Sequence, residues 1–126
     1  MTRFPQHPLC ACFLAALVVL AAGSVAHAQA SVDGIWSVAI ITETGACDRA
    51  YRYPVRIANG RVYHASEGDQ SFNIFGRVQP DGRVVVAVSR GDQRADGRGR
   101  LSGSQGRGVW RSPGGCAGRW EAERRS

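Results

Sequence analysis

The chain has 126 residues, of which 44% are hydrophobic, so it has room for one small folded domain and not for a multidomain enzyme. Its formal net charge is +6 and all sixteen basic residues are arginine, so long-range attraction favours anionic partners. Beyond the N-terminal region no apolar run is long enough to span a bilayer, and we expect no transmembrane segment in the mature chain.

The N-terminal segment, residues 1–28, has the features of a secretory signal peptide. An arginine precedes an apolar run over residues 9–22, and Ala26-His27-Ala28 follows as a small-x-small cleavage site. A second such site would place the cleavage after Ala30 instead. The mature domain, residues 29–126, is therefore expected in the periplasm or outside the cell.

Two of the four cysteines, Cys47 and Cys116, remain after removal of the leader. A domain of about one hundred residues buries only about 65% of its unfolded surface, so its core is marginal without a covalent link. Exported proteins meet an oxidising environment, in which paired cysteines form disulfides. We predict one disulfide, Cys47–Cys116, and two free thiols are the alternative.

The first half of the mature chain alternates apolar and polar residues in short segments separated by turn sequences. Residues 35–42 and 51–57 each carry apolar side chains at every second position, as strands with one buried face do. Asn59-Gly60 is typical of a two-residue type I′ hairpin turn, which fixes the register of the strands on either side. That register places Val55 opposite His64, so His64 points to the apolar face.

Four further hairpin turns are predicted in the second half of the chain, at residues 80–82, 91–92, 104–105 and 113–115. The resulting cross-strand pairs are Ile74–Val88, Gly76–Val86, Val78–Val84, Val84–Gly99, Val86–Gly97, Val88–Ala95, Leu101–Gly108, Gly99–Trp110, Gly108–Trp120 and Trp110–Gly118. One apolar face persists through every turn, and glycines stand beside the large tryptophans, as the interior of a narrow barrel requires.

These observations predict an all-β fold, a small antiparallel up-and-down (meander) barrel of about eight strands. Strand eight would lie beside strand one and abolish the two exposed edges. Cys47 and Cys116 fall at the rim where strand one ends and strand eight begins, so the predicted disulfide would link the two ends of the sheet.

Arginines collect on the predicted outward face of the last strands, at Arg83, Arg98, Arg100, Arg107, Arg111 and Arg119. The predicted register places Arg98 opposite Arg111 and Arg83 opposite Arg100, whereas Arg107 has Glu121 opposite. Directly opposed like charges destabilise a sheet, and guanidinium groups bind carboxylates and phosphates bidentately. Arg83, Arg98, Arg100 and Arg111 are therefore our candidate anion-binding site. A solvated arginine surface without a ligand is the alternative.

A second candidate site is the rim near the disulfide, where Tyr51, Tyr53 and His64 converge on the apolar face. Histidine and tyrosine are both known axial ligands of haem iron, so haem is a possible cofactor there. Against this, the interior of an eight-stranded barrel is narrow and must hold three tryptophans. The alternative is a hydrogen-bonded histidine with tyrosine neighbours and no ligand.

No catalytic or metal-binding pattern stands out in the mature chain. A hydrolytic triad needs a base beside a nucleophile, and the mature chain has one histidine and no spare cysteine. A zinc site needs three or four ligands, and the two cysteines are better used in a disulfide. We expect a protein that is not an enzyme and binds no metal.

Four segments, residues 33–37, 47–55, 88–91 and 116–122, resemble a group of small secreted alphaproteobacterial proteins. Proteins of that group are often labelled as related to exoproteins of haem utilisation or adhesion, and the resemblance covers nearly the whole mature chain. Gly34-Ile35-Trp36 at the start of the first strand is also similar to lipocalins, avidins and periplasmic inhibitor barrels, which implies a fold analogy only.

Together the sequence predicts a non-enzymatic binding or adhesion-type protein that presents an arginine-rich face. The expected partners are an anionic glycan, lipopolysaccharide or a small anionic ligand, with no specific nucleic acid, and we expect a monomer. Haem binding at the rim of Tyr51, Tyr53 and His64 is one alternative. Inhibition of a secreted protease or lysozyme through the rim loops is the other.

Overall fold

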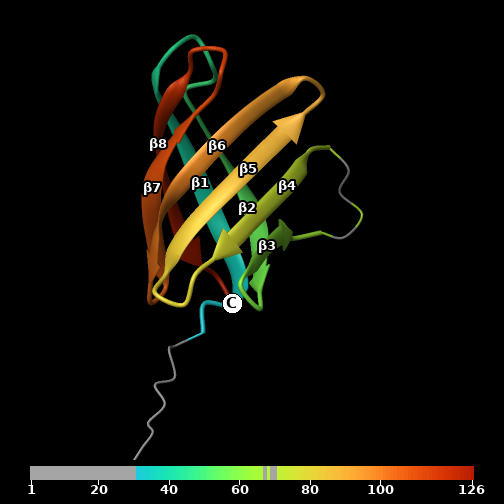
Figure 1. Cartoon of the computed structure of the whole chain (residues 1–126), viewed down its shortest axis with the longest axis vertical. Coiled ribbons are helices and arrows are strands. Elements are labelled where there is room, and N and C mark those ends of the chain that lie inside the picture. Colours follow the sequence, from blue (N-terminus) through green and yellow to red (C-terminus); the bar gives the residue numbers. More distant parts are fainter. Residues whose placement is uncertain (1–30, 67, 69–70) are drawn as a thin grey trace, which may run out of the picture.

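The computed structural model describes residues 31–66, 68 and 71–126, and the predicted signal peptide, residues 1–28, lies outside this part of the chain. The described residues form the strands β1 (Gly34–Thr44), β2 (Ala50–Ala58), β3 (Arg61–His64), β4 (Asn73–Val78), β5 (Arg83–Arg90), β6 (Gln93–Ser102), β7 (Gln105–Arg111) and β8 (Ala117–Arg124). They close into an eight-stranded antiparallel barrel in sequence order (Figure 1), so the predicted all-β meander barrel is confirmed. Across the same residues, no helix combines the length and apolarity needed to cross a membrane.

Tight turns set most of the register as the sequence predicts. Asn59 and Gly60 have φ values of 51° and 78°, the left-handed values of a type I′ turn, and Val55 pairs with His64. The predicted pairs of β4 with β5, β5 with β6 and β7 with β8 are all present. The hairpin loops at residues 80–82, 91–92 and 113–115 are therefore confirmed.

The β6–β7 hairpin departs from the prediction by two residues. Its turn is Gly103-Ser104, closed by the pair Ser102–Gln105, and Gly103 adopts a φ of 64° that favours glycine. Leu101 therefore lies opposite Gly106 and not Gly108. Because side chains alternate with a period of two, the shift keeps the same residues on the inner face but changes which residues stand opposite one another.

The same shift moves Trp110 along its neighbour strand. Trp110 lies opposite Gly97 and not Gly99, whereas Gly99 lies opposite Gly108. On its other side Trp110 pairs with Gly118, as predicted. Trp110 thus still lies between two glycines, which leave room for its ring as predicted. One of the two glycines is Gly97 and not the predicted Gly99.

Barrel closure joins the first strand to the last. β1 pairs with β8 along nearly its whole length, from Trp36–Arg124 to Thr44–Ala117. At the end of this ladder, Cys47 and Cys116 form a disulfide with a Cα–Cα distance of 6.2 Å. The β1–β2 and β7–β8 loops lie together at one end of the molecule (Figure 1), so both the closure and the predicted disulfide are confirmed.

The core is most deeply buried at the end of the barrel away from the disulfide. Trp36 is fully buried there, with its indole N–H donating to the carbonyl of Val32 at 2.9 Å. The guanidinium of Arg124 lies 5.5 Å from the Trp36 ring centroid. Leu101 is also buried at this end. The Trp36 end is therefore closed by side chains, whereas inward residues near the disulfide, such as Trp110, are only partly buried.

Candidate functional site

Three arginines form a row across the outer face of neighbouring strands. Arg83 of β5 pairs with Arg100 of β6, as predicted, and Arg100 pairs in turn with Arg107 of β7. Opposed side chains in a sheet are about 5 Å apart at Cβ, so the three guanidinium groups share one patch. Glu121 follows Arg107 in the row, but its carboxylate forms an ion pair at 3.4 Å with Arg119.

The other two predicted anion-binding residues do not face each other, and that prediction is wrong. Because of the two-residue shift in the β6–β7 hairpin, Arg111 lies opposite Asp96 and Arg98 lies opposite Val109. On its other side Arg98 pairs with Val85. Within the described residues, no ion pair joins Arg98 to a carboxylate. Arg98 therefore remains a candidate ligand for an anion, although not as half of an Arg98–Arg111 clamp.

Two carboxylates lie among these arginines. Asp81 accepts a hydrogen bond from the backbone N–H of Arg83 and forms a 2.9 Å ion pair with the same residue, so the pKa of its carboxyl is lowered. The side-chain hydrogen bonds and charge of Arg94, together with the charge of Arg111, lower the pKa of Asp96. Both carboxylates are solvent-exposed and offset part of the positive charge without covering it.

Exposed apolar side chains accompany the arginines on this outer face. Phe75, Val85 and Val109 are 63%, 56% and 49% exposed, and the last two flank Arg98 across the sheet. They line an outer groove of about 660 Å³ together with Arg98 and Arg111. The sequence interpretation overlooked these residues, although the alternation already placed them at outward positions.

The rim residues Tyr51, Tyr53 and His64 do lie near one another, but Phe72 intervenes. The rings of Tyr51 and Tyr53 stack with centroids 6.1 Å apart. Phe72 packs edge-on against Tyr53 at 5.4 Å and contacts the His64 ring at 4.4 Å. The rim is thus an aromatic cluster of four side chains, one of which the sequence interpretation did not include in the site.

The protonation of Tyr53 bears on what this rim can bind. Burial raises the pKa of Tyr53 to about 12, with a smaller contribution from Tyr51. A tyrosine that ligates iron does so as a phenolate, and burial of the Tyr53 hydroxyl opposes formation of that charged form. Among the described residues no group of three or more His, Cys, Asp and Glu side chains could hold a metal ion.

Comparison with known protein families, with curated proteins and with solved structures gives no match. The molecule is thus defined by its own geometry: a small disulfide-linked β-barrel with a basic, partly apolar outer face and an aromatic rim.

Proposed function

We propose that this protein is a non-enzymatic binding protein of the periplasm or the cell exterior, whose arginine-rich outer face binds an anionic surface such as lipopolysaccharide. The observation that carries the proposal is the row Arg83–Arg100–Arg107 on three adjacent strands. The predicted leader at residues 1–28 supports the location.

The row has an electrostatic cost that a ligand would remove. Like charges placed directly opposite each other destabilise a sheet by up to about 1 kcal/mol per pair, and here two such pairs share Arg100. A phosphate or carboxylate between the guanidinium groups would turn this repulsion into charge-assisted hydrogen bonds. Arg61 and Arg77 form a further opposed pair, on β3 and β4.

The apolar side chains beside the row favour an amphiphilic surface over a free anion. Phe75, Val85 and Val109 stand exposed around Arg98 in the outer groove. A partner that offers both negative charge and hydrocarbon would cover arginine and apolar surface together, as lipopolysaccharide and anionic lipids do. A small hydrophilic anion would use only the arginines.

The test is binding of the mature protein to lipopolysaccharide aggregates and to phosphatidylglycerol vesicles, with and without Arg100→Gln plus Arg107→Gln. Each arginine near an anionic surface contributes about 1 kcal/mol, so the double variant should bind roughly 30-fold more weakly. Removing two members of a like-charge row should not destabilise the fold, so weaker binding would not reflect unfolding.

The matched control is Arg49→Gln plus Arg52→Gln. It removes the same charge from the β2 side, four strands away from β6 and three away from β7 in the closed barrel. The control should keep most of the binding, and binding by the unmodified protein should fall steeply at high salt because of screening. Equal losses in the two double variants would mean that net charge, and not this face, governs the interaction, and the proposal would fail.

Haem binding and hydrolase inhibition stay predictions, because no specific contact in the structure favours either. An absorption titration of the mature protein with haemin, repeated with His64→Ala, examines the first. A saturable Soret shift at about one equivalent of haemin, lost in the His64→Ala variant, would support haem binding at the rim. A panel of soluble proteases and lysozyme examines the second.

A further inference from the structure

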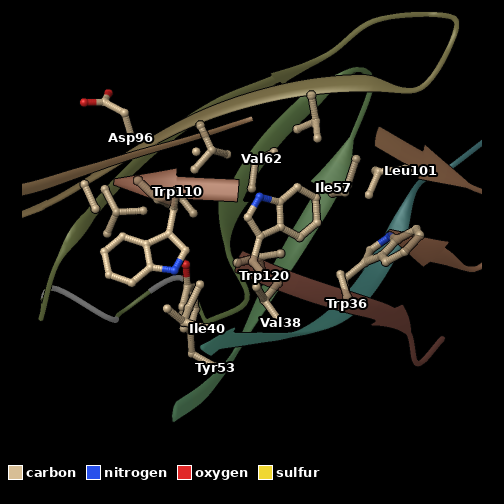
Figure 2. Close-up of a pocket in the computed structure, with 18 of the residues that line it drawn as sticks. Trp36, Val38, Ile40, Tyr53, Ile57, Val62, Asp96, Leu101, Trp110 and Trp120 are labelled. Atoms are coloured by element: carbon tan, nitrogen blue, oxygen red, sulfur yellow. The ribbon is translucent and has the colours of Figure 1, made fainter. Parts of the chain in front are cut away.

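The interior of the barrel contains a cavity of about 110 Å³. Its lining comes from every strand, and Trp110, Trp120 and Trp36 follow one another along it in Figure 2. The three tryptophans therefore do not fill the barrel, contrary to what the narrow interior led us to expect. An engineered apolar cavity of about 150 Å³ binds benzene, so the observed space suits a molecule of that order.

The cavity has one closed end and one accessible end. At the closed end Trp36, Ile57 and Leu101 are 0%, 4% and 5% exposed. At the disulfide end, Tyr51 lines the cavity and is 51% exposed. Because the lining residues at the Trp36 end are buried whereas Tyr51 is exposed, a ligand would enter past the aromatic rim.

The lining is mainly apolar, and its indole N–H groups are already hydrogen-bonded to backbone carbonyls. The indole N–H of Trp110 donates to the carbonyl of Ile41 at 3.2 Å, and that of Trp120 donates to the carbonyl of Arg98 at 3.3 Å. The carboxylate of Asp96 points away from the tryptophans in Figure 2. A charged ligand would lose its hydration without a partner in the cavity, so the lining selects against charge.

Glycines on β6 and β7 determine which part of the barrel interior is filled by Trp120 and which part is left empty. A Cβ at Gly99 or Gly108 would meet a backbone carbonyl of the neighbouring strand and also the indole of Trp120, whose Cζ2 would lie 2.5 Å from the first and whose Nε1 would lie 2.6 Å from the second. Trp120 therefore packs directly over these two glycines. A Cβ at Gly97 would meet Trp120 at 3.6 Å and Trp110 at 3.8 Å. Those are ordinary contacts, so the wall beside Trp110 is less crowded than the wall beside Trp120.

We propose that this cavity is a binding site for one compact, uncharged apolar molecule, of about benzene size, that enters at the rim of Tyr51 and Tyr53. The site is distinct from the arginine face, because it lies inside the barrel and none of the arginines lines it. Asp96 is the one outward side chain in its lining. A ligand with a single polar group would place that group at the tyrosine hydroxyls, since the rest of the lining is hydrocarbon and aromatic ring.

The experiment is a titration of the mature protein with toluene, followed by tryptophan fluorescence and by the NMR signals of the indole N–H groups. We expect saturable one-to-one binding that shifts the signals of Trp110 and Trp120. Benzoate, which has a similar shape and a charge, should bind at least about 100-fold more weakly because its carboxylate would be desolvated. Equal binding of toluene and benzoate would overturn the proposal.

Two variants with a matched control locate the site. Ala95→Phe places a ring among the lining residues near the rim and should weaken toluene binding by about tenfold or more through overpacking. Ala87→Phe makes the same change on the adjacent strand at a position that lines the outer groove, and it should leave the affinity unchanged. Unchanged toluene affinity in a folded Ala95→Phe protein would refute the interior site.

The variant Val86→Ala guards against failure of the Ala95 variant to fold. It enlarges the cavity and should shift the preference from toluene towards propylbenzene. If the preference does not move, the ligand is not in this cavity. Arg100→Gln plus Arg107→Gln should not affect toluene binding, so the interior site and the arginine face can fail independently.

Discussion

Replacing both disulfide cysteines by alanine, Cys47→Ala with Cys116→Ala, should destabilise the barrel without unfolding it. The bond joins residues 69 positions apart, and in the chain-entropy model a loop of that length is worth about 4 kcal/mol at 25 °C. The free energy of unfolding of domains of this size is about 5–15 kcal/mol, so the double variant should still fold. For about one hundred residues, the loss corresponds to a fall in Tm of roughly 20 °C.

The expected survival has a structural reason. β1 and β8 remain paired from Trp36–Arg124 to Thr44–Ala117, so the closure of the barrel does not depend on the sulfur atoms. Alanine suits position 116 because Cys116 is only 6% exposed. In the chain-entropy model, a disulfide stabilises a protein by restricting its unfolded chain, so loss of the bond should leave the native fold unchanged.

The assay is urea and thermal unfolding of the oxidised protein and the double variant, followed by circular dichroism. The reduced and alkylated wild-type protein serves as a second form without the bond. A loss below about 1 kcal/mol would show that the chain-entropy argument does not apply to this loop. An unfolded double variant would show instead that the β1–β8 ladder is too weak to close the barrel.

Two further predictions concern the barrel wall and the rim. Gly99→Ala should lower the free energy of unfolding in urea by about 1–3 kcal/mol, because its Cβ would overlap the backbone carbonyl of Arg107 and the ring of Trp120. Gly97→Ala should be neutral or stabilise by up to about 1 kcal/mol, because its Cβ would make only ordinary contacts. Equal effects of the two substitutions would contradict this packing. Because burial raises the pKa of Tyr53 from 10.0 to about 12, the unfolded chain loses this proton first and stability should fall between these two pH values. Tyrosinate absorbance should show a late step that disappears in Tyr53→Phe, and a wild-type titration complete near pH 10 would refute the burial argument.

The fold was largely predictable because the turns carry specific residues. Asn59-Gly60 and the glycine of the 80–82 loop fix register locally, and a wrong register by one residue would have placed arginines in the core. The β6–β7 register was the exception. Residues 97–100 and 106–108 alternate glycine with arginine, so a shift of two residues replaces each residue by one of the same kind. Glycine at position 103, and the pair Asp96–Arg111 in place of Arg98–Arg111, distinguish the two turns.

The candidate sites were less predictable than the fold. The Arg83–Arg100 pair follows from a well-defined hairpin and was predicted correctly, whereas the Arg98–Arg111 pair depended on the ambiguous one. The cavity could not be inferred because it is a small difference between the barrel volume and the volume of its side chains. Sequence places Trp120 on the inner face but does not say that it settles over Gly99 and Gly108 and leaves space beside Gly97.

The order of the strands also constrains how the molecule is made. Every strand pairing but one joins neighbours in sequence, so these hairpins can form one after another as the chain folds. The exception is the pairing of β1 with β8, which joins the two ends of the domain and is therefore expected to form last. Cys47 and Cys116 lie on the two sides of that last seam. During refolding, the disulfide should therefore form together with the β1–β8 pairing, and alkylation of free thiols at successive times would give the fraction of molecules in which this pairing has not yet formed.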